Sequence, residues 1–289
     1  GAFPSELLQT LPSRWRYQFF EVESGIDGCQ FQSGSNPDLV ALGDGWITSC
    51  PSKLFQSIGV NGLGDRLNDQ AITFLKSLGS SFESKVFPLA MSPWVLLFRR
   101  GEELLDRANE SWEVLLDPAL KGHVVLPNSP RLIMNLAERM SHNDSLRRLR
   151  QQAKSFDDRN ALNWLLSGKS KVAVLPLQYC LNNLTRDPRL SIGLPEEGCP
   201  LNWTLLLRPK STVEPFPSTW IEQLWGLPSL VNLLATGVIP PLPYSEITAG
   251  INSLPEKFQL IYQEKTIFKN GWSLPPLNDL EEEELGDRW

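Results

Sequence analysis

The residues of this chain that could do chemistry lie at two turns, and the first is Asn128-Ser129-Pro130-Arg131. This turn follows His123–Leu126, a run with the length of a buried strand. Ser before Pro is typical of a helix start, because the hydroxyl caps the helix and Pro fits its first turn. Ligands of open α/β sheets bind beyond the carboxyl ends of strands. Ser129 and Arg131 are therefore candidate ligand contacts, with Arg131 suited to an anion. The alternative is structural, with Ser129 as a cap and Arg131 in an ion pair.

The second turn is Gly43-Asp44-Gly45-Trp46, which follows a short apolar segment. Asp44 supplies a carboxylate and Trp46 an indole ring, and together they suit a cationic group through a charge-assisted hydrogen bond and a π face. The alternative is that Asp44 caps the following helix and that Trp46 packs beneath it.

Signatures of enzymes are scarce in the sequence. The two histidines, His123 and His142, have no cysteine or carboxylate at metal-ligand spacing. There is no G-x-S-x-G, Walker or dinucleotide motif. No strand precedes Gly59–Gly64, so we interpret this glycine-rich stretch as a connection and not as a phosphate loop. We expect no catalysis, no metal and no cofactor; a hydrolase or transferase is kept as the least favoured hypothesis.

Apolar runs of strand length alternate with helical segments, which predicts an α/β fold with mainly parallel sheets. Between Ser111 and Arg131 we expect a capped helix ended by Pro118, a Lys121-Gly122 turn, a strand and a helix start. The other expected strands are Trp15–Val22, Asp38–Leu42, Val95–Phe98, Lys171–Leu175, Leu190–Leu194 and Trp203–Leu207. The other expected helices include Phe3–Leu11, Asp157–Leu166, Leu177–Leu184 and Thr219–Ala235, which is broken at Gly226 and Pro228. Glu256–Ile261 is expected to be the last helix, before a solvated acidic tail at Glu281–Glu284.

The composition sets outer limits on function. With 289 residues the chain is long enough for two cores, and 41% hydrophobic and 21% charged residues are typical of globular proteins. No apolar run approaches the 18 residues of a membrane span. The net charge of -6 does not favour binding to nucleic acid. We see no signal peptide.

Several motifs occur in an order that resembles a known family. They are W-x-x-L-x-D-P-x-x-K-G-x-V-x-L from Trp112 to Leu126 with the Pro130-Arg131 helix start, Pro195-Glu196-Glu197-Gly198, Leu205–Pro209 and Gly237–Pro241. The series resembles family 1 periplasmic solute-binding proteins, and within them the spermidine/putrescine-binding components of ABC importers. The likeness covers residues 36–250.

This resemblance implies a fold and a partner. The fold would be the two-lobed α/β fold of periplasmic binding proteins of type II, with residues 1–93 plus 210–289 as lobe one and 94–209 as lobe two. Two hinge strands would cross near Trp94 and Thr204. The chain would act as a monomer that binds a small molecule without reacting with it and delivers it to an ABC permease, in a periplasm or a thylakoid lumen.

The four cysteines contain no C-x-x-C pair, which argues against zinc or thioredoxin chemistry. With the lobes that the resemblance implies, Cys29 and Cys50 lie in one lobe, and Cys180 and Cys199 in the other. One disulfide per lobe would then form in an oxidising compartment. Four unpaired buried thiols are the alternative.

Polyamine binders hold ammonium groups with carboxylates and methylene chains with aromatic rings, and this chain lacks most of those carboxylates. Ser129, Leu132, Asn202 and Thr204 occupy positions where the relatives carry acidic residues or an aromatic ring, and Pro176 replaces a Trp. The relatives also begin with a strand that contributes ligand contacts, and this sequence begins at the following helix. The residues that the resemblance places near the ligand, besides Asp44, Trp46, Ser129 and Arg131, are Ser92, Trp94, Gln178, Asn202, Trp203 and Thr204.

Two functional hypotheses follow from this pattern. In the first, the chain is a solute-binding protein that binds putrescine or spermidine weakly or takes a more neutral ligand. In the second, the scaffold has lost transport and binds a protein partner in a periplasm or thylakoid lumen.

Overall fold

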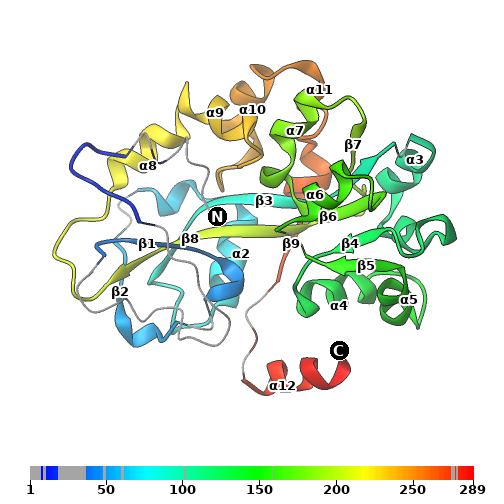
Figure 1. The fold of residues 1–289 in the computed structure, drawn as a ribbon. Helices are drawn as coiled ribbons and strands as arrows, with labels where there is room; N and C mark the ends of the chain where they lie inside the picture. Colours follow the sequence, from blue (N-terminus) through cyan, green and yellow to red (C-terminus); the bar gives the residue numbers. More distant parts are fainter. Residues whose placement is uncertain are drawn as a thin grey trace. The chain divides into compact units, whose positions relative to one another are not determined.

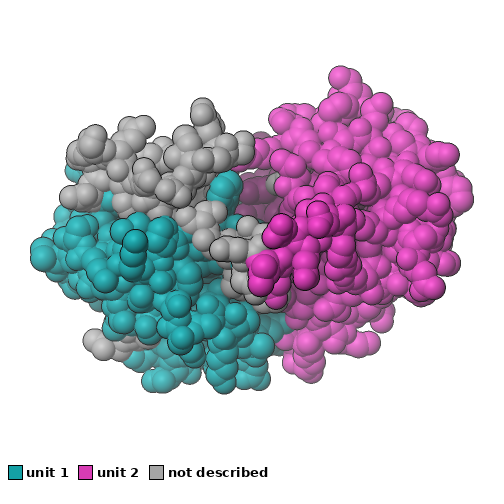
Figure 2. Space-filling view, turned by 90° about the horizontal axis from the view of Figure 1, so that it is seen from below, with its two compact units in different colours: residues 1–91, 202–256, 275–278 teal, residues 92–201, 257–274, 279–289 magenta. Residues whose placement is uncertain are grey.

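The computed structural model describes residues 8, 11–18, 37–47, 50–59, 62–100, 102–157, 159–274, 277 and 279–289. Strands and helices alternate along them in a mixed α/β fold, so the predicted fold class is confirmed (Figure 1). The chain divides into two compact units, coloured separately in Figure 2. Unit 1 consists of residues 1–91, 202–256 and 275–278, and unit 2 of residues 92–201, 257–274 and 279–289. The chain passes between the units inside two strands, β3 (Val86–Arg99) and β8 (Pro200–Pro209). It passes between them again after residue 256, after residue 274 and after residue 278.

In unit 1, β8 is paired antiparallel with two short strands. β1 (Val40–Gly43) pairs with it from Val40↔Leu207 to Gly43↔Thr204, and β2 (Phe55–Gln56) pairs at Phe55↔Pro209. The helices of this unit are α2 (Asp69–Ser77), α8 (Ser218–Trp225), α9 (Ser229–Ala235) and α10 (Tyr244–Asn252).

Aromatic side chains join the helices of unit 1 to its strands. The ring of Phe74 on α2 stacks on Trp203 of β8, with centroids 5.0 Å apart. Phe87 of β3 stacks on Trp225 of α8 at 5.6 Å, and the indole N–H of Trp225 donates to the carbonyl of Leu89 at 3.2 Å. Stacked pairs of buried aromatic rings add stabilisation beyond the area that they bury.

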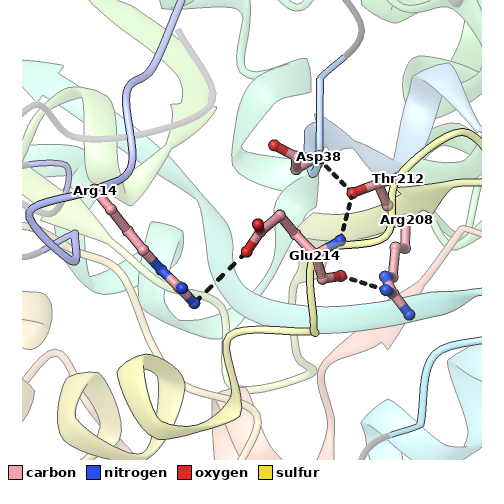
Figure 3. Close-up of polar contacts among 5 residues, drawn as sticks. All are labelled: Arg14, Asp38, Arg208, Thr212 and Glu214. Carbon is pink, nitrogen blue, oxygen red and sulfur yellow. Dashed lines mark hydrogen bonds and ion pairs between the residues drawn. The ribbon is translucent and has the colours of Figure 1, made fainter.

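A polar cluster fixes the start of β1 to the segment that follows β8 (Figure 3). Thr212 Oγ1 donates to the Asp38 carboxylate, and the Glu214 N–H donates to Thr212 Oγ1 at 3.1 Å. The Arg208 guanidinium donates to the Glu214 carbonyl, and Arg14 lies 3.6 Å from the Glu214 carboxylate. These contacts hold β1 in place, and therefore also the turn that follows it.

The sheet of unit 2 has strands of both directions. β3 pairs antiparallel with β6 (Val172–Pro176) and with β7 (Leu190–Gly193). β4 (Val124–Leu126) pairs parallel with β6 and with β5 (Ala153–Phe156). The expectation of mainly parallel sheets was therefore wrong, because the apolar pattern of a buried strand indicates its burial and not its direction.

Unit 2 also contains helices. They are α3 (Glu102–Glu110), α4 (Pro130–Glu138), α5 (Ser145–Gln152), α6 (Ala161–Leu166), α7 (Leu181–Arg186), most of α11 (Glu256–Gln259) and α12 (Asp279–Arg288). Among the described residues, no helix has both the length and the apolarity needed to cross a membrane.

The segment between Ser111 and Arg131 has the predicted cap, turn, strand and helix start, and it adds a second 3₁₀ helix (Pro118–Leu120) that the sequence did not predict. The hydroxyl of Ser111 accepts the Glu113 N–H at 3.1 Å at the start of a 3₁₀ helix, and Gly122 turns the chain with a φ of 71° before β4. A left-handed φ favours glycine, because it has no Cβ. The predicted break in the helix of residues 219–235 is also confirmed, since α8 ends at Trp225 and α9 begins at Ser229.

Other predicted elements differ from the structure. Residues 15–18, expected to begin a strand, form none; the rest of that prediction, and residues 3–7 and 9–10 of the first predicted helix, lie outside the described residues. Glu256–Ile261 is not the last helix, since a π-helix (Glu264–Lys269) and α12 follow it. The acidic stretch at 281–284 belongs to α12, and its glutamates 281, 283 and 284 are exposed, as expected of a solvated segment.

Residues 257–274 and 279–289 belong to unit 2, whereas the sequence analysis expected all of residues 210–289 in lobe one. The contacts of β9 (Trp272–Ser273) explain the placement of residues 257–274. Trp272 lies opposite Pro200 in a parallel pair, and its indole N–H donates to Asn135 Oδ1 at 2.7 Å. The Arg139 guanidinium lies over the Trp272 ring, 3.6 Å from its centroid.

Candidate functional site

In unit 1 the structure brings together the predicted ligand residues of β1 and β8. Asp44 begins a 3₁₀ helix immediately after β1, and the pair Gly43↔Thr204 sets this turn beside β8. Oδ1 of Asp44 accepts the backbone N–H of Trp203 at 3.1 Å. The carboxylate is therefore both a candidate ligand contact and a structural link between two strands.

The side chains of this group differ in their exposure. Trp46 is 39% exposed, and Asp44 and Asn202 are half-buried, so all three offer surface to a ligand. Thr204 is only 4% exposed, and the ring of Trp203 is fully buried against Phe74. Trp203 thus belongs to the core of unit 1, and Asp44, Trp46 and Asn202 form the accessible part of the group. We call these three residues the Asp44 group.

In unit 2 five predicted residues lie at one edge of the sheet. β4 and β6 are parallel, with Val124 opposite Val172, so their carboxyl ends lie at the same edge. Ser129 and Arg131 follow β4, and Gln178 follows β6. β3 runs the other way, and its pair Trp94↔Pro176 places Ser92 and Trp94 at that edge too.

The helix start after β4 has the predicted geometry. Pro130 is the first residue of α4, and the Ser129 hydroxyl accepts the Leu132 N–H at 3.4 Å as the N-cap. Arg131 is half-buried in the first turn. Ser129 therefore has the structural role that was its alternative, as the N-cap of α4, whether or not it also contacts a ligand.

Gln178 has a feature that the sequence did not predict. Its backbone N–H donates to the Ser92 hydroxyl at 3.1 Å, which fixes the residue at the sheet edge. Its side-chain Nε2 is buried, and among the described residues this amide nitrogen has no hydrogen-bond partner. A buried donor without a partner is unfavourable by about 1–3 kcal/mol, so such an atom calls for an explanation. An acceptor on a bound ligand would supply one. We call Ser92, Trp94 and Gln178 the Gln178 group.

The charges of the candidate residues are few. Across the ten predicted ligand residues, Asp44 is the single carboxylate and Arg131 the single cation. Within the described part of the chain, no three metal-ligating side chains gather into a cluster. Residues 60 and 61 of the glycine-rich stretch lie outside the described residues.

The cysteine prediction is wrong for one pair. Cys180 and Cys199 are free thiols, each completely buried. Cys180 Sγ donates to the Leu177 carbonyl within its own turn at 3.5 Å, and burial raises the pKa of both thiols far above the usual range of a cysteine. Cys50 is buried, and Cys29 lies outside the described residues, so the pairing of these two stays a prediction.

Comparison with known proteins finds similarity in structure alone. No family model and no curated protein matches the sequence. The spermidine/putrescine ABC transporter substrate-binding protein PotD of Streptococcus pneumoniae superposes with a TM-score of 0.60 at 14% identity, covering 88% of this chain and 82% of that one. An ABC transporter structure from Clostridium perfringens gives 0.62 at 15% identity, with the same coverage of 88% and 82%.

A third solved structure with a similar fold has a different name from the first two. Apo FutA2 from Synechocystis PCC6803 has a TM-score of 0.57 at 15% identity, over 89% of this chain and 82% of that one. The chain has the fold of periplasmic substrate-binding proteins. The resemblance read from the sequence is confirmed in the fold, and at these identities the likeness does not extend to the ligand.

Proposed function

We propose that this chain is a solute-binding protein of an ABC importer, that it does not catalyse a reaction, and that its ligand is a small neutral or zwitterionic molecule. The fold supports the solute-binding role, because substrate-binding proteins of ABC transporters share it. The permease partner and an extracytoplasmic location, in a periplasm or a thylakoid lumen, are part of this proposal.

The observation that carries the ligand class is the shortage of carboxylates. A linear polyamine has two or more ammonium groups, and each needs an anionic or strongly accepting partner when it leaves water. Asp44 is the single carboxylate of the candidate set, and one of its oxygens already accepts the Trp203 N–H. Arg131 would repel a second ammonium group placed near it.

Each group, taken by itself, has a chemical preference. The Asp44 group presents a carboxylate oxygen and the exposed indole of Trp46, which suit a single cationic or hydroxyl group. The Gln178 group presents a buried amide N–H, which suits a carbonyl or carboxylate oxygen. Neither group by itself offers the two carboxylates that a diamine would require.

A thermal-shift screen tests this proposal. A ligand that binds only the folded chain stabilises it and therefore raises the melting temperature. At a free ligand concentration of one hundred times Kd, the free energy of unfolding increases by about 2.7 kcal/mol. We expect a shift of several degrees with one neutral or zwitterionic metabolite, and a reduced shift in Asp44→Asn.

Two outcomes would contradict the proposal. A thermal shift with polyamines and with no other metabolite would show that the chain binds ammonium groups although Asp44 is the single carboxylate of the candidate set. The absence of any shift across a broad metabolite set, together with recovery of a protein partner, would favour the repurposed scaffold instead.

A further inference from the structure

Unit 2 contains a pocket that is separate from both groups described above. It is an open surface depression with a volume of ≈ 490 Å³. Its lining residues are Leu146, Arg147, Arg150, Gln151, Phe156 and Arg288.

The pocket is built by α5, the end of β5 and the end of α12. Arg288 of α12 donates to the Glu138 carboxylate of α4 at 2.7 Å. Arg150 of α5 donates to the carbonyl of Trp289 and lies over its ring, 4.9 Å from the centroid. Phe156 meets the same ring edge-to-face at 5.5 Å. These contacts hold the end of α12 against α5 and β5.

The lining residues carry three guanidinium groups and no carboxylate of their own, and two of the three are ion-paired to carboxylates outside the lining, Arg147 to Asp144 and Arg288 to Glu138. A guanidinium has five N–H donors. In the described structure each of the three makes a single hydrogen bond: Arg147 to Asp144, Arg150 to Trp289 and Arg288 to Glu138. Each group therefore retains donors for a further acceptor. Leu146 and Phe156 add apolar surface beside them.

We propose that this pocket binds a small organic dianion, a molecule with two carboxylate or phosphate groups on a short apolar body. The guanidinium groups would bind the anionic groups, since planar bidentate pairing suits carboxylates and phosphates, and Leu146 and Phe156 would contact the apolar body. The arginines are partly exposed, so the binding is salt-sensitive. The rival explanation is that the arginines only hold α12 and α5 in place.

Arg147 distinguishes these explanations. Its ion pair is with Asp144, three residues earlier in the chain, and its side chain is 72% exposed, so Arg147→Gln leaves the contacts of α12 intact. Arg186→Gln is the matched control, since Arg186 is an exposed arginine at the end of α7 in the same unit and does not line the pocket.

The test is isothermal titration of the full chain with benzene-1,3-dicarboxylate at low salt, beside its uncharged diamide. We expect saturable binding of the dicarboxylate, about tenfold weaker binding in Arg147→Gln and in Arg288→Gln, unchanged binding in Arg186→Gln, and none of the diamide. Absence of saturable binding would overturn the proposal, as would equal binding by Arg147→Gln or by the diamide. None of these residues belongs to the Asp44 or Gln178 group, so this result is independent of the proposed transport function.

Discussion

The Asp44 group of unit 1 and the Gln178 group of unit 2 present opposite kinds of polar atom. Asp44 offers an acceptor that is already engaged, because it links the turn after β1 to the backbone of β8. Gln178 offers a buried donor without a partner among the described residues. The difference teaches that Asp44 combines a structural role with any ligand role, whereas the amide nitrogen of Gln178 makes no hydrogen bond within the described part of the chain. Substitutions in the two units should therefore affect stability differently.

The largest loss of stability is expected at Trp203, the buried residue whose N–H donates to Asp44. Trp203→Ala removes a fully buried ring and its stack on Phe74, so we expect a loss of about 3–5 kcal/mol in the free energy of unfolding. Urea denaturation measures it. A loss below about 1 kcal/mol would show that the ring is not packed as described.

Asp44 allows its two roles to be separated by a pair of variants. Asp44→Ala removes the acceptor of the Trp203 N–H and should lower the free energy of unfolding by about 1–2 kcal/mol. Asp44→Asn keeps an oxygen acceptor and removes the charge, so its stability should stay near that of the wild type while binding of a cationic ligand group weakens. Equal stability of the two variants would show that the strand link contributes nothing.

Gln178→Met should have the reverse effect on stability. Since Nε2 has no partner among the described residues, its replacement by an apolar side chain of similar length should leave stability unchanged or raise it by about 1 kcal/mol.

Gln152→Met is the matched control for this variant. Gln152 is buried in the same unit, and its Nε2 donates to the Asp117 carbonyl at 2.9 Å. This variant should lose about 1–2 kcal/mol. Chemical denaturation of both variants tests the contrast, and an equal loss in both would mean that Gln178 has a structural partner.

The smallest effect concerns the thiols of unit 2. Cys180 and Cys199 are buried, and burial raises the pKa of each, so little reactive thiolate forms at neutral pH. We expect maleimide to label them only when the chain is denatured, and mass spectrometry of unreduced peptides to find no link between them. Rapid labelling of the native protein, or a linked peptide, would contradict the structure.

Local signals predicted much of the fold. The cap at Ser111, the Gly122 turn and the Ser129-Pro130 helix start lie where their side chains and allowed φ angles dictate. Asp44 was selected from its turn, and its carboxylate accepts the Trp203 N–H; its role as a ligand contact stays a prediction.

Features that depend on contacts distant in sequence were not predicted. The direction of β3 and the placement of β9 against β8 are set by pairing partners more than 60 residues away. Gln178 was named from its position alone, and its unpartnered amide depends on what lies around it in space. The pairing of Cys180 with Cys199 was inferred from their shared lobe, which does not ensure that two thiols meet.

Calorimetric titration of the wild-type chain with spermidine and putrescine tests the central claim most directly. With Asp44 as the single carboxylate of the candidate set, we predict no saturable binding tighter than a Kd of about 100 μM for either amine. Binding with a nanomolar to low-micromolar Kd would contradict the account, because two ammonium groups would then have found partners that the Asp44 and Gln178 groups do not contain.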